Sequence, residues 1–302
     1  QNLPENEYTE LITKYSPYRE FKDYILYTIN LGILDLPKKT FEILDETDSE
    51  DYNFKLNQPE LYLLNINSKS KNNYVFFFEN PKAKLMIKGH VPIKGKFQFI
   101  GNYKNIYSKK EFIDKDVVRH DKNLLTGCVT FLDVNFQDAS ISSDKLRCED
   151  SVNILNSKGR IDKIEISNST YDGLDIDFSE ISINQMNINN SGNDCADFSF
   201  GKYTILKSNL NGCKDKAFSF GEHSKALVND TIINNSLMGI VSKDSSIVEV
   251  KNGKGLQIKK YCLAAYNKKP EFEGAIIVDK GFKCDNENFY DQESFIKWDD
   301  TK

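Results

Sequence analysis

Three segments of the sequence repeat one pattern: Glu149-Asp-Ser-Val-Asn-Ile154, Tyr171-Asp-Gly-Leu-Asp-Ile176 and Asn193-Asp-Cys-Ala-Asp-Phe198. Their first aspartates follow one another at intervals of 22 residues, and Lys214-Asp-Lys-Ala-Phe-Ser219 continues the column 21 residues later. Alternating apolar stretches lie between the copies and end in Asn-Ser at Asn168, Asn190 and Asn235. A period of 21 to 23 residues built from short strands and turns, without the Leu-x-x-Leu-x-Leu frame of leucine-rich repeats, is typical of a parallel β-helix.

Stacking these repeats determines which side chains face the core. Rungs of a β-helix lie about 4.8 Å apart, so equivalent residues form ladders along the axis. We expect the ladders that contain Val152 and Ile154 to point inward, and Asn153, Asp175 and Asp197 to point outward. The asparagines before the turns are expected to form a ladder of hydrogen-bonded amides. The sequence therefore predicts an all-β fold, a right-handed parallel β-helix over residues 124–270.

The flanking parts of the chain have other patterns. The apolar spacing from Tyr8 to Tyr15 is helical, and a second short helix is expected from Tyr18 to Ile29. Short β-type runs follow. We predict that residues 1–123 form a mixed α/β cap or irregular early rungs, because an open β-helix end exposes its core and its edge hydrogen bonds. Residues 271–302 are expected to be a short capping segment at the other end.

Composition excludes some classes of protein. The 302 residues carry 45 acidic and 40 basic side chains, a net charge of -5, and 39% of them are hydrophobic. That apolar fraction is sufficient for a buried core. The longest apolar runs are too short to cross a bilayer and no signal sequence is apparent, so we expect no membrane span. A mildly acidic balance argues against nucleic acid as a partner, because nucleic-acid-binding proteins usually present a basic face.

The sequence contains six cysteines: Cys128, Cys148, Cys195, Cys213, Cys262 and Cys284. The first two and the last two are each close to one repeat apart, which brings the members of each pair onto neighbouring rungs. Disulfides are then sterically possible and would favour an extracellular or cell-envelope setting. Free cysteines that fill the core are the alternative. No CxxC or His/Cys spacing indicates a structural zinc site.

The acidity is concentrated in the repeats. From Asp150 to Asp197 there are 9 acidic and 3 basic residues, a local balance of -6. Two carboxylates about 5 Å apart repel by roughly 3 kcal/mol at an effective dielectric of 20. Three arrangements offset this cost: the side chains cap turn N–H groups, they bind a hard cation such as Ca²⁺, or some stay protonated for acid/base chemistry. For the Ca²⁺ alternative we expect Asp175 and Asp197 to be the ligands.

An acidic strip edged by lysine and histidine predicts a polysaccharide site. Hydrolysis would use two carboxyl groups, one to protonate the leaving oxygen and one to activate water or to attack carbon. β-Elimination from a uronic acid would use a cation to neutralise the sugar carboxylate and a base such as Lys216 or His223. The candidate catalytic residues are Asp172, Asp175, Asp194, Asp197, Lys216 and His223, and the candidate substrate-binding residues are Asp177, Lys214, Glu222 and Lys243.

One resemblance rests on Asp172-Gly-Leu-Asp-Ile, Asn193-Asp-Cys and Lys214-Asp-Lys-Ala-Phe-Ser-Phe-Gly-Glu. This run is similar in layout to the polygalacturonase-type glycoside hydrolases, which implies that Asp172 and Asp194 match two of their catalytic aspartates. Asn193 stands where that family has a further Asp, and Lys214 to Lys216 replaces its Gly-His-Gly motif.

A second resemblance rests on Cys148-Glu-Asp-Ser-Val-Asn, Asp172-Gly-Leu-Asp-Ile-Asp-Phe, Asn193-Asp-Cys-Ala-Asp-Phe-Ser and Ser242-Lys-Asp-Ser-Ser. These segments more closely resemble a bacterial parallel β-helix family often attached to CotH-type spore-coat kinase domains. That family implies an extracellular or envelope setting and no settled activity. The chain has no kinase motif, so kinase activity is not implied.

Two hypotheses about function follow. In the first, the chain is an extracellular carbohydrate-directed β-helix that binds or cleaves a polysaccharide on the acidic strip, as a polysaccharide lyase or glycoside hydrolase if it is an enzyme. In the second, it is a non-catalytic structural or adhesive module of a cell envelope or phage-tail assembly. Ca²⁺ is the one cofactor considered, and a homotrimer or attachment to a larger surface assembly is considered for the quaternary structure.

Overall fold

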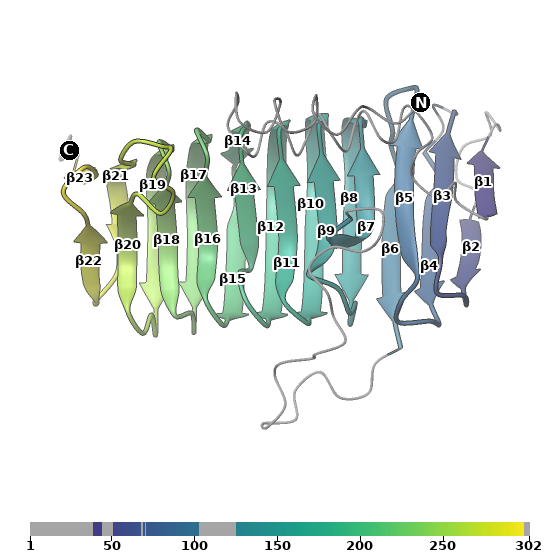
Figure 1. The fold of residues 1–302 in the computed structure, drawn as a ribbon, viewed down its shortest axis with the longest axis horizontal. Helices are drawn as coiled ribbons and strands as arrows, with labels where there is room; N and C mark the ends of the chain where they lie inside the picture. Colours follow the sequence, from purple (N-terminus) through teal and green to yellow (C-terminus); the bar gives the residue numbers. More distant parts are fainter. Residues whose placement is uncertain (1–38, 44–50, 68, 70, 103–124, 299–302) are drawn as a thin grey trace, which may run out of the picture.

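The chain coils into two parallel sheets that share one core (Figure 1). The computed structural model describes residues 39–43, 51–67, 69, 71–102 and 125–298. These ranges contain strands and turns but no helix, and the helices expected between Tyr8 and Ile29 lie outside them. The all-β, parallel β-solenoid architecture predicted from the repeats is therefore confirmed. A search of the described residues for a helix long and apolar enough to cross a membrane finds none.

Within the part of the chain that the structure describes, sheet A has 11 strands, and each pairs in parallel with the next. They are β1 (Lys39–Ile43), β3 (Leu61–Ile66), β5 (Lys84–Gly89), β7 (Gly127–Leu132), β9 (Asp150–Leu155), β11 (Asp172–Asp177), β13 (Ala196–Ser199), β16 (Lys216–Gly221), β18 (Met238–Lys243), β20 (Tyr261–Tyr266) and β22 (Glu287–Tyr290).

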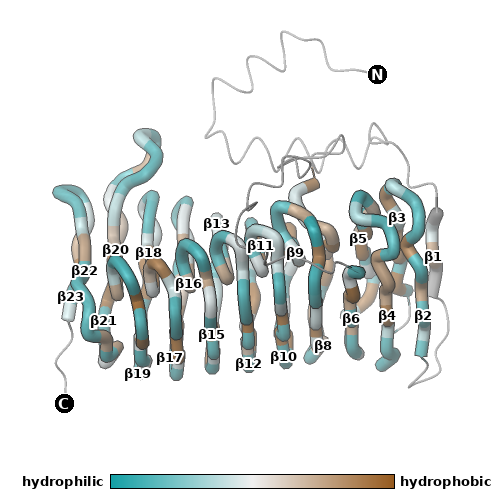
Figure 2. Tube along the Cα trace, turned by 90° about the horizontal axis from the view of Figure 1, so that it is seen from below, coloured by the Kyte–Doolittle hydropathy of each residue, from teal (hydrophilic) through white to brown (hydrophobic). Residues whose placement is uncertain are grey.

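In the described ranges sheet B has 12 strands, half of them longer than any strand of sheet A, and Figure 2 shows the two sheets as two facing rows. They are β2 (Asp51–Leu56), β4 (Asn73–Phe78), β6 (Lys96–Gly101), β8 (Asn135–Asp144), β10 (Lys158–Ser169), β12 (Glu180–Ser191), β14 (Lys202–Ile205), β15 (Ser208–Cys213), β17 (Lys225–Asn234), β19 (Ile247–Leu256), β21 (Ile276–Lys283) and β23 (Phe295–Trp298). The described strands before residue 124 and after residue 270 belong to the same two sheets as the central rungs.

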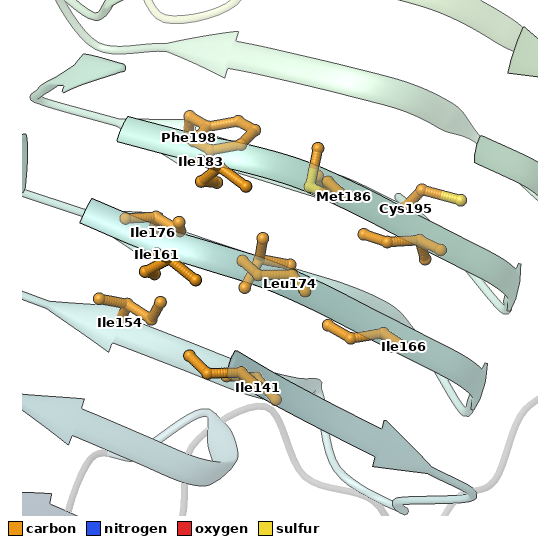
Figure 3. Packing of buried hydrophobic residues seen from close by; sticks show 14 of the residues in the cluster. Ile141, Ile154, Ile161, Ile166, Leu174, Ile176, Ile183, Met186, Cys195 and Phe198 are labelled. Atoms are coloured by element: carbon orange, nitrogen blue, oxygen red, sulfur yellow. The ribbon is translucent and has the colours of Figure 1, made fainter. Parts of the chain in front are cut away.

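The register places equivalent residues side by side on neighbouring rungs. Leu174 of β11 pairs with Val152 of β9 and with Ala196 of β13, and all three are fully buried. Ile176 lies between Ile154 and Phe198 in the next inward ladder (Figure 3). The inward ladders predicted from the sequence are confirmed.

The core changes composition along the axis. Near the N-terminal end it contains stacked aromatic rings beside aliphatic side chains, with centroids 4.8 Å apart for Tyr74 and Phe97 and 5.5 Å apart for Phe76 and Phe99. In the central rungs, aliphatic side chains, mainly isoleucine, take their place (Figure 3). Identical neighbours along a ladder pack well because they repeat the same shape at each rung.

The turns after the sheet B strands use asparagine. Asn168 and Asn190 have φ angles of 58° and 64°, in the left-handed region that asparagine tolerates better than most residues. The side-chain amide of Asn190 donates a 3.3 Å hydrogen bond to Asn168, and that of Asn168 donates a 2.7 Å bond to Asp144. The predicted amide ladder is confirmed at these turns.

Three disulfides close individual turns of the solenoid. They are Cys128–Cys148, Cys195–Cys213 and Cys262–Cys284, with Cα atoms 5.4, 5.3 and 6.0 Å apart. Each joins a cysteine at or just before the start of a sheet A strand to one at or beyond the end of the sheet B strand that follows it. The disulfide alternative is therefore the one the structure adopts, and no described cysteine is free.

Candidate functional site

The outer face of sheet A carries the acidic residues. In β11, strand alternation places two of them there and the start of the strand places a third. Leu174 and Ile176 point into the core, so Asp175 and Asp177 point outward. Gly173 also faces inward, since a Cβ atom there would lie 3.1 Å from the Ile188 side chain. Two consecutive inward residues place Asp172 on the same outer face as Asp175 and Asp177.

We call the acidic side chains of this face the carboxylate cluster. They lie on three neighbouring rungs, on or next to β9, β11 and β13, and are Asp150, Asp172, Asp175, Asp177, Asp194 and Asp197. Of the candidate residues predicted from the sequence, the structure brings five aspartates together in this cluster, with Lys216, Lys243 and Glu222 beside it. Asp150 joins them as a further member.

The column that contains Asp172 and Asp194 caps the turns. Oδ1 of Asp172 accepts hydrogen bonds from the backbone N–H of Asp194 at 2.7 Å and from the Asn193 side chain at 2.8 Å. Oδ1 of Asp194 accepts a 2.9 Å bond from the backbone N–H of Lys216 on the next rung. Both aspartates are buried. The turn-capping role considered for this column is therefore present.

Two lysines neutralise part of the cluster. Nζ of Lys216 lies 3.1 and 3.2 Å from the two carboxylate oxygens of Asp194 and also contacts Asp215. Nζ of Lys243 lies 3.6 Å from Oδ2 of Asp197. Burial acts to lower the pKa of both lysines, but the neighbouring carboxylates outweigh it and raise the pKa of each. Both ammonium groups therefore stay charged.

Asp175 and Asp177 have pKa values shifted toward the uncharged form. The Asn153 side chain donates to Oδ2 of Asp175 at 3.3 Å and to Oδ2 of Asp177 at 3.4 Å. Burial, followed by the charge of Asp177, raises the pKa of Asp175 well above its usual value. Burial and the charge of Asp197 raise the pKa of Asp177 to about 8. Both shifts favour the protonated form of these side chains.

Asp197 is ionised. Burial acts to raise its pKa, but the Lys243 and Lys216 charges and hydrogen bonds, among them one from the Phe198 N–H at 3.0 Å, together lower it. Its side chain is 23% exposed, so solvent reaches it. Asp197 is the register partner of Asp175 on the adjacent strand. The face thus presents a carboxyl group with a raised pKa directly beside one with a lowered pKa.

An aromatic corner borders the cluster and was not predicted from the sequence. The rings of Phe178 and Phe200 stack with centroids 4.7 Å apart, at φ angles of 51° and 49°. An aromatic residue with positive φ is uncommon and is held in place by its surroundings. The available signal was positional, because each Phe follows a strand of sheet A and the two are one repeat apart.

A loop of residues 267–275 supplies a further contact that sequence spacing did not indicate. Nζ of Lys269 binds Oε1 of Glu222, whose Oε2 accepts a 2.6 Å hydrogen bond from the Ser199 hydroxyl. Glu222 is 2% exposed. Lys269 lies 47 residues along the chain from Glu222, outside the repeat period, so no repeat pattern places the two together.

Lys214 and His223 lie at the margin. Both are exposed. The His223 ring packs edge-on against Phe272 with centroids 5.1 Å apart, and its backbone N–H donates to the Asp244 carbonyl. The contacts described for His223 are therefore with neighbouring turns and not with the carboxylate cluster.

One group of carboxylates has the spacing of a cation site. Oxygens of Asp172, Asp194 and Asp197 all lie within 4.8 Å of one another, which suits a hard cation. Asp197 was predicted as a ligand, whereas the other predicted ligand, Asp175, is not in this group. Lys216 and Lys243 already place positive charge on two of the three carboxylates.

No protein-family model matches the chain, and no curated protein matches it. The two family resemblances drawn from the sequence therefore stay predictions. Among solved structures, the enzymatically active domain of bacteriophage CBA120 tailspike protein 2 is similar, with 9% sequence identity and a TM-score of 0.38. The alignment covers 92% of this chain and 44% of that one, so the chain spans less than half of it. Similarity at this level does not transfer a function.

Proposed function

We propose that this chain is a carbohydrate-directed β-solenoid that hydrolyses a polysaccharide on the outer face of sheet A. The observation that carries the proposal is the pair formed by Asp175 and Asp197, which are register partners on β11 and β13. The pKa of Asp175 is raised, that of Asp197 is lowered, and both side chains are partly exposed. Carboxyl groups with separated pKa values are what acid/base cleavage of a glycosidic bond requires.

Each carboxyl group has one role in the proposed reaction. Asp175 donates its proton to the leaving oxygen as the glycosidic C–O bond breaks, and Asp197 attacks the anomeric carbon to form a covalent intermediate. Water then cleaves that intermediate and returns a proton to Asp175. Neighbouring strands are about 4.8 Å apart, close to the roughly 5 to 5.5 Å carboxyl separation of retaining glycosidases and below the separation of inverting ones. We therefore expect retention of configuration.

Hydrolysis suits this face better than β-elimination. Elimination needs a neutral base to remove a proton from the sugar, and Lys216 and His223 were the candidates. The carboxylates of Asp194 and Asp215 hold Lys216 in its charged form, which is unable to accept a proton. His223 packs on Phe272, at the margin of the face.

The surroundings of the pair offer contacts for a sugar chain. Asp177 and Lys243 lie next to it and provide a carboxyl group with a raised pKa and an ammonium group. Phe178 and Phe200 provide apolar ring surface at the corner. Three disulfides favour an oxidising compartment, so an extracellular or surface polysaccharide is the proposed substrate.

A structural or adhesive surface module is the second candidate. The observation that favours it is the turn capping by Asp172 and Asp194, which gives these two carboxylates a role that needs no substrate. In this case the cluster stabilises the corners of the solenoid, and the chain attaches to a larger surface assembly.

Incubation with a panel of neutral and uronic-acid polysaccharides separates the two candidates. We expect new reducing ends without unsaturated products, and NMR of the first-formed product should show the anomeric configuration of the substrate. Asp175→Asn and Asp197→Asn should each abolish the activity, whereas Glu180→Gln, on an exposed site of sheet B, should not. Absence of reducing ends with every polysaccharide would eliminate hydrolysis and leave the structural module.

A further inference from the structure

We propose that the Lys268 ammonium group and the Tyr266 hydroxyl, here called the anion subsite, bind the acidic group of a sugar, so that the substrate is an acidic polysaccharide. The acidic group is a carboxylate or a sulfate ester. Tyr266 is the last residue of β20, and Lys268 follows two residues later. Neither residue was predicted from the sequence. The inference rests on the proposed function, because it names the chemical class of substrate for the same face.

Tyr266 lies on the outward side of sheet A. Leu263 and Ala265 of β20 belong to the core, so Tyr266 points outward. Its register partner on β18 is Lys243. The charges of Lys243 and Lys216 act on the Tyr266 phenol, so the hydroxyl lies near both ammonium groups. Burial outweighs these charges and raises the pKa of Tyr266, which keeps its O–H as a hydrogen-bond donor.

Lys268 is held in place through the backbone of its loop. Oδ1 of Asp244 accepts hydrogen bonds from the backbone N–H groups of Lys268 at 2.6 Å and of Lys269 at 2.8 Å. The preceding Asn267 donates its backbone N–H to Oδ2 of Asp291 at 2.7 Å. Because the backbone is already fixed, less conformational entropy is lost when the Lys268 side chain binds a ligand.

Lys268 differs from the neighbouring lysines in its contacts. Lys216, Lys243 and Lys269 each form an ion pair with a carboxylate. Within the part of the chain that the structure describes, no ion pair or hydrogen bond involves the Lys268 ammonium group or the Tyr266 hydroxyl. Lys268 is exposed and Tyr266 is partly exposed. Two hydrogen-bond donors are therefore available to a ligand at this end of the face.

The neighbouring lysines create a positive potential at Lys268. The charge of Lys243 is the largest of the causes that lower the pKa of Lys268, followed by burial. The charge of Lys216 adds to this effect, and that of Asp197 opposes it. An anion at this position is therefore attracted by several ammonium groups. The raised pKa of Asp175 also reduces the negative charge that would repel an acidic polymer.

The separation between the anion subsite and the proposed cleavage site determines what the contact can change. Asp197 is in β13, and β16, β18 and β20 follow it in sheet A. Three strand spacings separate β13 from β20, which is about 14 Å. A contact at this distance from the cleaved bond holds the polymer equally before and during the reaction, so it lowers KM and leaves kcat unchanged.

Affinity electrophoresis, in gels that contain a polysaccharide, measures binding without requiring cleavage. The acidic probes are alginate, hyaluronan and dextran sulfate, and the matched neutral probes are carboxyl-reduced alginate, carboxyl-reduced hyaluronan and dextran. The protein carries Asp175→Asn, which keeps that side chain uncharged and prevents hydrolysis of the gel polymer. We expect at least one acidic probe, and none of the neutral ones, to retard the protein. Retardation by alginate or hyaluronan identifies the acidic group as a carboxylate, and retardation by dextran sulfate alone identifies it as a sulfate ester.

Single substitutions then test the two residues. Lys268→Met should weaken binding of the retarding polymer about tenfold, and Tyr266→Phe about threefold. Lys225→Met removes an exposed lysine from sheet B and should leave binding unchanged. Where hydrolysis is observed with Asp175 intact, Lys268→Met should raise KM about tenfold and leave kcat within about twofold. Far-UV circular dichroism checks that each variant is folded.

Three results would overturn the proposal: equal binding of an acidic probe and its neutral counterpart, equal loss of affinity in Lys268→Met and Lys225→Met, or no retardation by any acidic probe. Failure of the proposed function gives a different result. In that case no polysaccharide yields new reducing ends, while retardation that depends on Lys268 persists.

Discussion

The outer faces of the two sheets treat charge in opposite ways. On sheet B, Glu180 pairs in register with Lys202, their charged atoms are 3.2 Å apart, and the side chains are 68% and 69% exposed. On sheet A, Asp175 pairs with Asp197, and both are largely withdrawn from water. In a solenoid, equivalent side chains of successive repeats lie next to one another. Opposite charges in water can stack at little cost, whereas like charges away from water require protons or lysines.

A cavity of about 540 Å³ lies on the outer side of sheet B, lined by residues that include Lys225 and Glu249. Glu249 has a pKa below its usual value because Lys251 hydrogen-bonds to it, as expected of a surface carboxylate in an ion pair. The raised carboxyl pKa values needed for proton donation occur on sheet A. Four predictions test this difference between the two outer faces, beginning with the largest expected effect.

Loss of the ionised carboxylate should have the largest effect. Asp197→Asn keeps the size of the side chain but removes the nucleophile, so we expect hydrolysis of a polysaccharide substrate to fall by about 10³-fold or more. Reducing-end assays at matched protein concentration measure it. Glu180→Gln is the matched change on sheet B and should leave the rate within about twofold. A rate in Asp197→Asn close to that of the unmodified chain would remove Asp197 from the mechanism.

Loss of one buried lysine should destabilise the fold. Lys216→Met leaves Asp194 buried without its cation, and breaking one side of a buried ion pair costs about 3 kcal/mol. Lys202→Met breaks an exposed pair and should cost less than about 0.5 kcal/mol. Urea denaturation followed by circular dichroism gives both values. Similar losses in the two variants would mean that the cluster is no more sensitive than the solvent-exposed face.

The pH dependence of stability should have opposite signs on the two faces. Asp177 has a folded-state pKa of about 8, above its unfolded value, so the stabilisation it adds is complete below about pH 4 and is lost as the pH rises through 8. We expect Asp177→Asn to reduce the fall in unfolding free energy between pH 5 and 8 by about 1 to 2 kcal/mol, after discounting for partial exposure.

Glu249 is the control for that profile. Its pKa is lowered, so its contribution is present above the unfolded pKa and is lost as the pH falls through the folded one. Glu249→Gln should therefore alter the profile only in the acidic range. An Asp177→Asn profile parallel to that of the unmodified chain from pH 5 to 8 would show that Asp177 is already ionised at pH 5.

The smallest effect expected is that of calcium. Lys216 and Lys243 already neutralise Asp194 and Asp197, so a cation at Asp172, Asp194 and Asp197 would gain little. We expect the melting temperature to differ by less than about 1 °C between Ca²⁺ and EDTA. A rise of several degrees with Ca²⁺ that disappears in Asp172→Asn would instead establish the cation site.

The fold was predictable from the sequence because the repeat period, and the inward positions that recur with it, can be read directly from the order of residues. Val152, Leu174 and Ala196 recur at the repeat interval, and that recurrence requires stacking. The gathering of Asp172, Asp175 and Asp197 on one face followed from the same period. The repeat period did not reveal that Gly173 faces inward, and this inward position is what places Asp172 on the outer side.

The remainder of the site depends on contacts outside the repeat. Lys269 reaches Glu222 from a loop, and no period relates the two. The choice between a protonated Asp175 and an ionised Asp197 depends on which carboxylate lies within reach of Lys243, a distance that the sequence does not contain. The three arrangements considered for the aspartates therefore stayed open in the sequence, because each aspartate has a different set of neighbours.

The closed turns also determine how the molecule responds to tension. If its two ends are pulled apart, a solenoid lengthens as successive coils peel away, each releasing its backbone. The three disulfides close loops with sequence separations of 20, 18 and 22 residues, and a closed loop cannot extend under tension. At roughly 3.4 Å per extended residue, about 200 Å of chain stays unavailable until the sulfur bonds are reduced. Under reducing conditions the stretched chain would therefore be longer, and its length would increase in three discrete steps, one for each disulfide.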